Sequence, residues 1–297
     1  MMPDAVRTWR AGSREIVLDH PILMGILNVT PDSFSDGGKF FSPGAAIDHA
    51  ARMIADGAEI IDVGGESTRP GAEPVSVEEE IGRVLPVVRM LHERWPSVAV
   101  SIDTTKAAVA EAALKAGAAI INDVSAMRLD AAMPLAAGRS GCGVILMHSR
   151  GNVSDMATYE HAVYSDVTRE VISELGSQLL VADEAGVDRK SIVLDPGFGF
   201  AKRSEHSAQL LRDLRRFATL DAPVMVGVSR KRFVREASHS LAPEDSDAAT
   251  AAVNVMALER GAMIFRVHNV RLNRRALDVA WSMLTTMAQM KEKMAQV

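Results

Sequence analysis

The chain has 297 residues, of which 47% are hydrophobic and 24% are charged, and its net charge at pH 7 is −5. This composition excludes a largely disordered chain, and the negative charge argues against a binder of nucleic acid or of membrane surfaces. No apolar run approaches the roughly 18 residues of a membrane span. Residues 1–14 are charged, unlike a signal peptide, and Cys142 is the single cysteine, so we expect a cytoplasmic protein without disulfides.

Short β-rich runs alternate with helical patterns along nearly the whole chain. Residues 8–18, with a turn at residues 11–13, are expected to form a short hairpin ahead of the first run. Eight runs then follow, several of them apolar throughout, which is typical of parallel strands covered on both faces. These runs are Ile22–Leu27, Glu59–Val63, Val98–Ile102, Ala118–Ile121, Gly143–Met147, Ser191–Leu194, Pro223–Val228 and Met263–Val267.

The segments between these runs carry helix signals. Ser76 and Glu79 predict a capping box at one helix start, and residues 107–116 are rich in Ala and Lys. Eight strand–helix units in this order predict an α/β protein, a single-domain (β/α)8 TIM barrel. We expect one domain over residues 1–297, with the barrel at about residues 20–292. A doubly wound open sheet remains the structural alternative.

Polar residues stand where the predicted strands end. Because all strand C-termini of such a barrel meet on one face, where barrel enzymes build their active sites, we expect one shared polar site there. Taken singly, an Asp or Asn after a strand is most often a helix cap or a turn residue. The residues are Asn28, Asp62, Asp103, Asn122, Asp123, His148, Asp195, Ser229, Arg230, Lys231, Arg266 and His268.

Two loops and one pair of cations extend this pattern. Residues 29–42 and 64–76 form long loops dense in Gly, Pro and hydroxyl groups, which suits either a tolerated surface loop or a lid that closes over substrate.

Arg266 and His268 lie two residues apart and therefore on the same side of an extended segment. Paired cationic donors suit a phosphate or pyrophosphate, and a salt-bridged structural arginine is the alternative.

Long motifs run through these strand ends and loops. The first covers residues 24–38, MGILNVTPDSFSDGG, and the second covers residues 62–71, DVGGESTRPG. Shorter ones follow at residues 101–104, 121–123, 146–148, 194–200, 229–231 and 266–268. In this order, and over about residues 22 to 280, they resemble the signatures of the dihydropteroate synthase family.

The resemblance implies a transferase of folate biosynthesis. It would condense 6-hydroxymethyl-7,8-dihydropterin pyrophosphate with para-aminobenzoate, by loss of pyrophosphate and then attack of the amine, to give 7,8-dihydropteroate, with Mg2+ as cofactor. Sulfonamides would compete with para-aminobenzoate. The family is typically dimeric through late barrel helices, so a homodimer is expected. Val279, Leu284 and Met287 could serve that purpose, although core packing explains them equally well.

The resemblance also implies a role for each matching residue. The catalytic set is Asp62, Asp103, Lys231, Arg266 and His268. The pterin-binding set is Asp103, Asn122, Met147, Asp195, Phe200, Lys231 and Arg266. Pyrophosphate would contact Asn28, Thr68, Arg69, Arg266 and His268, with Asn28 also the Mg2+ ligand. Para-aminobenzoate would contact Phe34, Thr68, Pro70, Phe200, Ser229 and Lys231.

The chemistry of these side chains agrees with the implied reaction. The Asp195 carboxylate can accept hydrogen bonds from the pterin amino group and ring N–H, and Asn122 can read the neighbouring edge. Asp62 and Asp103 can stabilise positive charge on the exocyclic carbon after pyrophosphate leaves.

Four positions depart from the family pattern, and two other functions stay open. Asn269 replaces a usual Asp, Ala201 a usual Gly, Arg232 a small residue and Ser207 a frequent Asn. The first alternative is a methyltetrahydrofolate:corrinoid methyltransferase, which would not need residues 229–231 in this form. The second is a non-catalytic pterin-binding paralogue, which would bind pterin tightly without releasing pyrophosphate.

Overall fold

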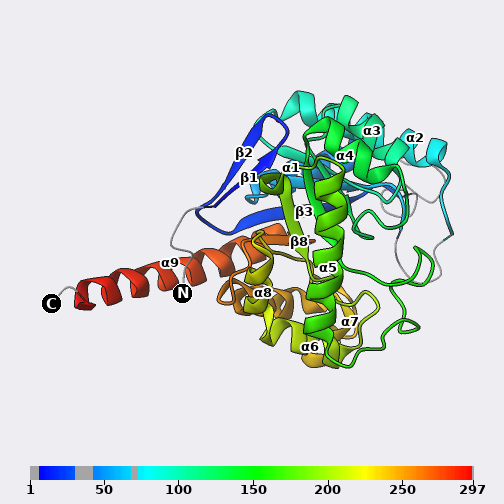
Figure 1. The fold of residues 1–297 in the computed structure, drawn as a ribbon. Coiled ribbons are helices and arrows are strands. Elements are labelled where there is room, and N and C mark those ends of the chain that lie inside the picture. The colour runs from blue at the N-terminus through cyan, green and yellow to red at the C-terminus, as the bar shows by residue number, and fades with distance from the viewer. Residues whose placement is uncertain (1–6, 31–42, 68–72, 296–297) are drawn as a thin grey trace.

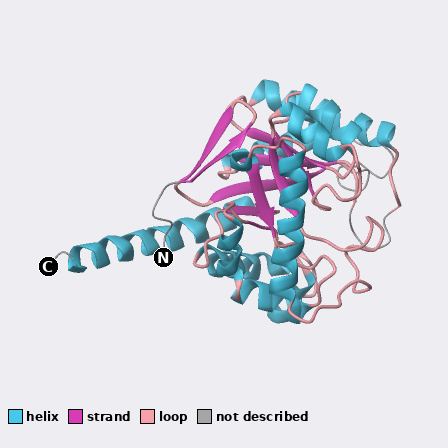
Figure 2. Ribbon diagram, viewed as in Figure 1, coloured by secondary structure: helices cyan, strands magenta, loops and turns pink. Residues whose placement is uncertain are grey.

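The computed structural model describes residues 7–30, 43–67 and 73–295, with side chains described as far as residue 286. Figure 2 shows its parallel strands enclosed by helices. Hydrogen bonds join the strands in the order β8-β7-β6-β5-β4-β3-β10-β9, and a parallel bridge between Leu194 and Val224 connects the two ends. This closure confirms the predicted (β/α)8 barrel over the open sheet. The strands are β3 (Ile22–Asn28), β4 (Ile60–Gly64), β5 (Ala99–Asp103), β6 (Ile120–Asp123), β7 (Gly143–Met147), β8 (Ile192–Asp195), β9 (Met225–Val226) and β10 (Ile264–Val267).

The helices form the outer layer. They are α1 (Pro43–Ala55), α2 (Val77–Arg94), α3 (Ala107–Lys115), α4 (Met133–Ser140), α5 (Val167–Glu184), α6 (Ser204–Arg212), α7 (Arg232–Ser238), α8 (Asp247–Leu258) and α9 (Val270–Ala295), with short 3-10 turns at Arg189–Ser191, Leu214–Leu220 and Glu244–Ser246. The end of α9 projects well beyond the barrel (Figure 1). Among the described residues, we find no helix with the length and apolarity that a membrane crossing requires.

The strands are buried on both faces, as their unbroken apolar runs predicted. Every residue of β4, β6, β7 and β8 is buried, and Ile60, Ile61 and Val144 are completely inaccessible to solvent. Burying one such aliphatic side chain stabilises the fold by about 1.5–3 kcal/mol. The barrel interior is therefore a packed core, and polar chemistry is confined to its ends.

The predicted hairpin covers one end of that core. Strands β1 (Arg7–Ala11) and β2 (Arg14–Leu18) pair antiparallel around Gly12, whose φ of 65° is the left-handed conformation that glycine tolerates best. Trp9 is fully buried and donates its indole N–H to the carbonyl of Ser191, at 2.8 Å. Because Ser191 immediately precedes β8, the hairpin closes the N-terminal end of the barrel and leaves the C-terminal end for a site.

The seventh strand is shorter than the sequence suggested. We expected residues 223–228, but the ladder of β9 covers only Met225 and Val226. Pro223 has no N–H, and after Val226 the chain turns so that the N–H of Lys231 bonds to the carbonyl of Val228 at 3.1 Å. A Cβ on Gly227 would lie 3.4 Å from Oδ2 of Asp195, so the chain passes close to that carboxylate.

The capping box predicted at the start of α2 forms only one of its two hydrogen bonds. The Oγ of Ser76 accepts a hydrogen bond from the N–H of Glu79 at 3.2 Å, which caps α2 as expected. The Glu79 carboxylate pairs with Arg83 in the next helical turn, at 2.5 Å. The predicted reciprocal half of the capping box therefore gives way to an ion pair along the helix.

Candidate active site

Strand register brings the predicted polar residues together at the open end of the barrel. Asn28 lies opposite Gly64, Gly64 opposite Asp103, and Asp103 opposite Asn122, so four neighbouring strands contribute one row. Asp62 precedes Gly64 by two residues and therefore faces the same side one step deeper. The expectation that these strand ends meet is confirmed for this set.

The guanidinium of Arg266 donates hydrogen bonds to carboxylates on two of these strands. Its Nε donates to Oδ2 of Asp62 and its NH2 group to Oδ2 of Asp103, both at 2.6 Å, while Nδ2 of Asn122 donates to the same Asp62 oxygen at 3.0 Å. Burial raises the pKa of Asp103 to about 7, with Arg266 opposing the shift and Asp62 adding to it. Among the described residues, one guanidinium thus bridges two buried carboxylates, and the charge of Lys231 also acts on Asp103.

Two buried acceptors in this cluster stand open. The second carboxylate oxygen of Asp62 and the amide oxygen of Asn122 have no hydrogen-bond partner among the described residues. Buried polar atoms are almost always satisfied in native proteins, because leaving one unpaired costs about 1–3 kcal/mol. The two oxygens therefore indicate a ligand that presents N–H donors.

Asp195 adds a third carboxylate from the opposite wall. Its Oδ1 accepts the N–H of Gly197 at 2.7 Å. Burial raises its pKa to about 6, although that hydrogen bond and the cations of Lys231, Arg266 and Lys202 oppose the shift. Because its pKa lies near neutrality, this carboxylate changes its hydrogen-bonding capacity within the working range of an enzyme.

An apolar wall stands beside these polar groups. Phe200 and Met147 belong to one small buried cluster with Val124 and Met156. The ammonium nitrogen of Lys231 lies 3.8 Å from the centre of the Phe200 ring, a cation–π contact. Burial lowers the pKa of Lys231 to about 8. The arrangement suits a flat heterocycle with a polar edge.

Ser229 holds the ring of His268. The Ser229 hydroxyl accepts the backbone N–H of His268 at 3.2 Å and lies 3.0 Å from the ring Nδ1. With its own hydrogen directed to Nδ1, the ring proton is assigned to Nε2. Burial and the charges of Arg230 and Arg266 lower the pKa of His268 to about 3. The neutral ring is thus favoured in the free protein, and the expected cationic contact with pyrophosphate stays a prediction.

A set of hydrogen bonds and ion pairs, here called the clasp, holds the two described ends of the second long loop, and the sequence did not predict it. Glu66 accepts the backbone N–H of Val75 at 2.8 Å, and the Lys106 ammonium lies 3.1 Å from Glu66 and 2.6 Å from Glu80. Arg83 donates to the carbonyl of Gly65 at 2.8 Å. The two described ends of residues 66–75 are therefore fixed to α2 and α3. The sequence contained no local pattern for these distant pairs.

Three predicted strand-end residues do not join the site. The carboxylate of Asp123 accepts the N–H groups of Ser125 and Met127, at 2.7 and 3.0 Å, and shapes a turn. Arg230 makes a paired contact with Asp247, at 2.8 and 3.0 Å. His148 points toward Glu174 and Lys202. The described contacts of these three residues are therefore structural, although the charge of Asp123 still acts on Asp103 and that of Arg230 on His268.

Four predicted residues lie outside the described residues. They are Phe34, Thr68, Arg69 and Pro70. Their predicted contacts with pyrophosphate and para-aminobenzoate remain predictions.

The four departures from the family pattern lie outside the converging set. Ala201 adopts a φ of 47°, where glycine would be unstrained, and Arg232 lies 4.8 Å from the Tyr159 ring. Asn269 donates to Asp247 at 3.0 Å and accepts the N–H of Leu272, so it caps α9. Ser207 is buried, and its hydroxyl has no partner among the described residues.

Comparisons with known proteins agree with this geometry. A family model described as a pterin binding enzyme matches residues 24–268. A dihydropteroate synthase of Streptococcus pyogenes is 45% identical over 267 residues, which cover 90% of this chain and 97% of the relative. The structure of Xanthomonas albilineans dihydropteroate synthase with 4-aminobenzoic acid is similar, with a TM-score of 0.87 and 40% identity, over 95% of this chain and 99% of that one. A Yersinia pestis dihydropteroate synthase with a sulfonamide drug complex gives a TM-score of 0.87 at 38% identity, over 94% and 99%.

Proposed function

Because the chain belongs to the dihydropteroate synthases of the pterin binding enzyme family, we propose that the open end of its barrel is the site of their condensation reaction. The protein is a transferase of folate biosynthesis. It joins 6-hydroxymethyl-7,8-dihydropterin pyrophosphate to para-aminobenzoate and releases 7,8-dihydropteroate and pyrophosphate. The roles of individual residues below are proposals.

The open amide oxygen of Asn122 is the observation that supports the placement of the pterin. The aminopyrimidinone edge presents adjacent N–H donors, which Asp195 can accept as a carboxylate and Asn122 can accept through its amide oxygen. Met147 and Phe200 would cover one side of the ring system. Lys231, which already lies against Phe200, would border the same pocket.

Bond cleavage would place positive charge beside the cluster of carboxylates. When the carbon–oxygen bond to pyrophosphate breaks, both electrons leave with pyrophosphate and the exocyclic carbon becomes cationic. Asp62 and Asp103 share a single guanidinium, so their excess negative charge would stabilise that carbon. The remaining N–H groups of Arg266 and the Nε2–H of His268 would donate to the departing pyrophosphate.

The second substrate would approach from the side of Ser229, Lys231 and Phe200. Its neutral amine attacks the cationic carbon through the nitrogen lone pair, a carbon–nitrogen bond forms, and the proton that nitrogen then loses passes to solvent. Phe34, Thr68 and Pro70 would complete this subsite. The clasp at Glu66 fixes the ends of the loop that carries two of them. Sulfonamides would compete for the same subsite.

Mg2+ would bind at Asn28. A Cβ on Gly64 would lie 3.7 Å from both Oδ1 of Asn28 and Oδ2 of Asp103, so the missing side chain leaves room beside two oxygen atoms, of which the Asp103 oxygen already accepts from Arg266. Oxygen donors are the ligands that Mg2+ prefers, together with water and substrate phosphates, so these residues fit the ion. When bound, Mg2+ would neutralise charge on the pyrophosphate.

A homodimer is proposed on the face of the late helices. Val279 and Met283 on α9 are 63% and 58% exposed, whereas Leu284 packs against the core and the side chain of Met287 lies outside the described residues. A separate apolar groove lies between α6, α7 and α8 and includes Phe233 and Val253. The single buried cysteine supports a reducing, cytoplasmic location.

Calorimetry with the pterin pyrophosphate and Mg2+ tests the placement of the substrate. Asp195→Ala should abolish measurable pterin binding, because the variant loses the only carboxylate that we assign to the amino edge. Asp188→Ala, on the other side of the barrel at the hairpin, is the matched control and should bind normally. Near-normal affinity in Asp195→Ala would remove Asp195 from the site.

A further inference from the structure

Lys202 is a buried lysine for which the proposed reaction has no role. It belongs to the loop that joins β8 to α6, and the residue is 1% exposed. The ammonium group donates to Nδ1 of His148 at 2.8 Å, to the carbonyl of Phe200 at 2.9 Å and to the carbonyl of His148 at 3.4 Å. Lysine is almost never fully buried without such partners, so these contacts offset a large desolvation cost.

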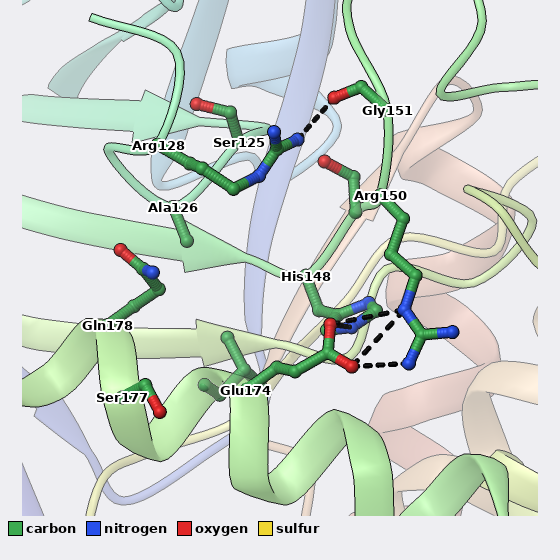
Figure 3. A pocket seen from close by; sticks show the side chains of 11 residues that line it. Ser125, Ala126, Arg128, His148, Arg150, Gly151, Glu174, Ser177 and Gln178 are labelled. Atoms are coloured by element: carbon green, nitrogen blue, oxygen red, sulfur yellow. Dashed lines mark hydrogen bonds and ion pairs between the residues drawn. The ribbon is translucent and has the colours of Figure 1, made fainter. Parts of the chain in front are cut away.

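The contacts continue through the barrel wall to its outer side. Since Nδ1 of His148 accepts from Lys202, the ring proton sits on Nε2, which donates to Glu174 of α5 at 2.9 Å. Arg150 holds the same carboxylate from the other side, with Nε 3.2 Å from each oxygen. Figure 3 shows His148, Glu174 and Arg150 close together. The three residues line a cavity of about 290 Å3. Lys202 thus joins the pterin-side loop to the wall formed by β7 and α5.

The loop that Lys202 holds is the one that carries Asp195 and Phe200. A Cβ on Gly197 would lie 1.8 Å from the His148 carbonyl oxygen and 3.3 Å from the Lys202 nitrogen, so the loop is pressed against the end of β7. The bond from Lys202 to the Phe200 carbonyl fixes the residue whose ring contacts Lys231. Movement of this loop would displace both the polar edge and the apolar wall of the pterin site.

Lys202 also supplies charge to a site crowded with ionisable groups. The cations that face Asp195 are Lys231, Arg266 and Lys202. The groups that face Lys202 are Asp195, Glu174, Arg150, Lys231, His148 and His206. Burial lowers the pKa of Lys202 to about 7, with Asp195 and Glu174 opposing the shift. The Lys202 ammonium therefore favours the ionised form of Asp195, and the Asp195 carboxylate favours the protonated form of Lys202. Loss of the ammonium would raise the pKa of Asp195.

We propose that Lys202 is a positioning residue of the pterin site, which holds residues 195–200 against His148 without touching substrate. This inference depends on the proposed contact between Asp195 and the pterin. It assigns a function to a side chain that resembles an ordinary surface lysine in the sequence, and it makes His148 and Glu174 supports of the site from outside it.

Lys202→Met tests the inference by calorimetry with 6-hydroxymethyl-7,8-dihydropterin across a range of pH. We expect affinity at least about tenfold weaker near neutral pH, and an acid loss of binding whose midpoint moves to higher pH. The KM for para-aminobenzoate should change less than the pterin affinity does, because, of the displaced residues, only Phe200 also borders that subsite. Lys190→Met, an exposed lysine that precedes β8, is the matched control and should match the parent protein.

Glu174→Gln covers the case in which Lys202→Met does not fold. It retains an oxygen for His148 but removes the charge that supports the Lys202 ammonium, so it should shift the same midpoint in the same direction by less. The inference would be overturned if folded Lys202→Met bound pterin with the parental affinity and lost binding at the parental pH midpoint. It would also be overturned if kcat fell uniformly without a change in that pH midpoint. If Asp195→Ala also binds pterin normally, the proposed placement of the substrate has failed instead.

Discussion

Nε of Arg266 lies 2.6 Å from Oδ2 of Asp62, a carboxylate that is completely buried, and the same guanidinium reaches Asp103 at 2.6 Å. One cation therefore serves carboxylates on the neighbouring strands β4 and β5. Such a cluster carries excess negative charge in a low-dielectric site, where charge interactions are stronger than in water. It is suited to a reaction that creates a cation beside it.

Replacing Arg266 should damage both activity and stability. Arg266→Met leaves two buried carboxylates unpaired, which costs about 3–5 kcal/mol of unfolding free energy. Arg266→Lys keeps the charge but cannot make both contacts, so kcat/KM should fall about 100-fold with a smaller loss of stability. Urea unfolding and steady-state kinetics measure the two effects. Arg169→Met, an exposed control on α5, should change stability by less than about 0.5 kcal/mol. Parental kcat/KM in Arg266→Lys would contradict the shared role.

Pterin affinity should fall in mild acid. Burial raises the pKa of Asp195 to about 6, so the free enzyme holds this group as a carboxylate above that pH and protonates it below. Protonation removes an acceptor, and affinity should then drop about tenfold for each further pH unit. Calorimetry with 6-hydroxymethyl-7,8-dihydropterin, which has no pyrophosphate to titrate, measures this directly. An affinity that stays constant through pH 5 to 7 would show that ionised Asp195 is not required.

Breaking the clasp at Lys106 should affect the second substrate more than the first. Lys106→Met leaves the fully buried Glu80 carboxylate without its cation and frees Glu66, so we expect a loss of about 3 kcal/mol in stability. Among molecules that remain folded, KM for para-aminobenzoate should rise severalfold while pterin affinity is retained. Lys115→Met, on the exposed face of the same helix, provides the comparison. Equal changes for both substrates would contradict a local effect on the loop.

Ala201→Gly should stabilise the protein. Ala201 has a φ of 47°, a left-handed conformation that costs a residue with a Cβ about 1 kcal/mol and glycine almost nothing. Ala112→Gly, in the middle of α3, should have the opposite sign, with a loss of about 1 kcal/mol. Thermal unfolding of both variants tests the pair. A destabilised Ala201→Gly would mean that packing of the methyl group outweighs the backbone strain.

Much of the fold could be predicted because burial leaves a pattern in the chain. Strands such as residues 143–147 are apolar throughout since helices and barrel interior cover both faces, and the hairpin has glycine where its turn needs a positive φ. Barrel closure then brings strand ends together without any further signal. The shortness of β9 was less visible, because it depends on the turn that carries residues 227–231 past Asp195.

The composition of the site was harder to predict from the sequence. Asn122 and Asp123 are adjacent, and strand alternation directs one toward the barrel axis and the other away, but it does not say which. Asn122 meets Asp62, whereas Asp123 shapes a turn. Lys202 and His148 are 54 residues apart, and their contact exists only once β7 and β8 pair. No local pattern distinguishes such a lysine from a surface one.

Product formation tests the central claim most directly. Folded protein is mixed with Mg2+, the pterin pyrophosphate and para-aminobenzoate, and 7,8-dihydropteroate is followed by chromatography with mass detection while pyrophosphate release is recorded. We predict a product with the mass of 7,8-dihydropteroate that forms only when both substrates are present. Its formation should be reduced when Mg2+ is removed. Pterin binding without dihydropteroate, in protein shown to be folded, would contradict the synthase function and indicate a pterin-binding paralogue.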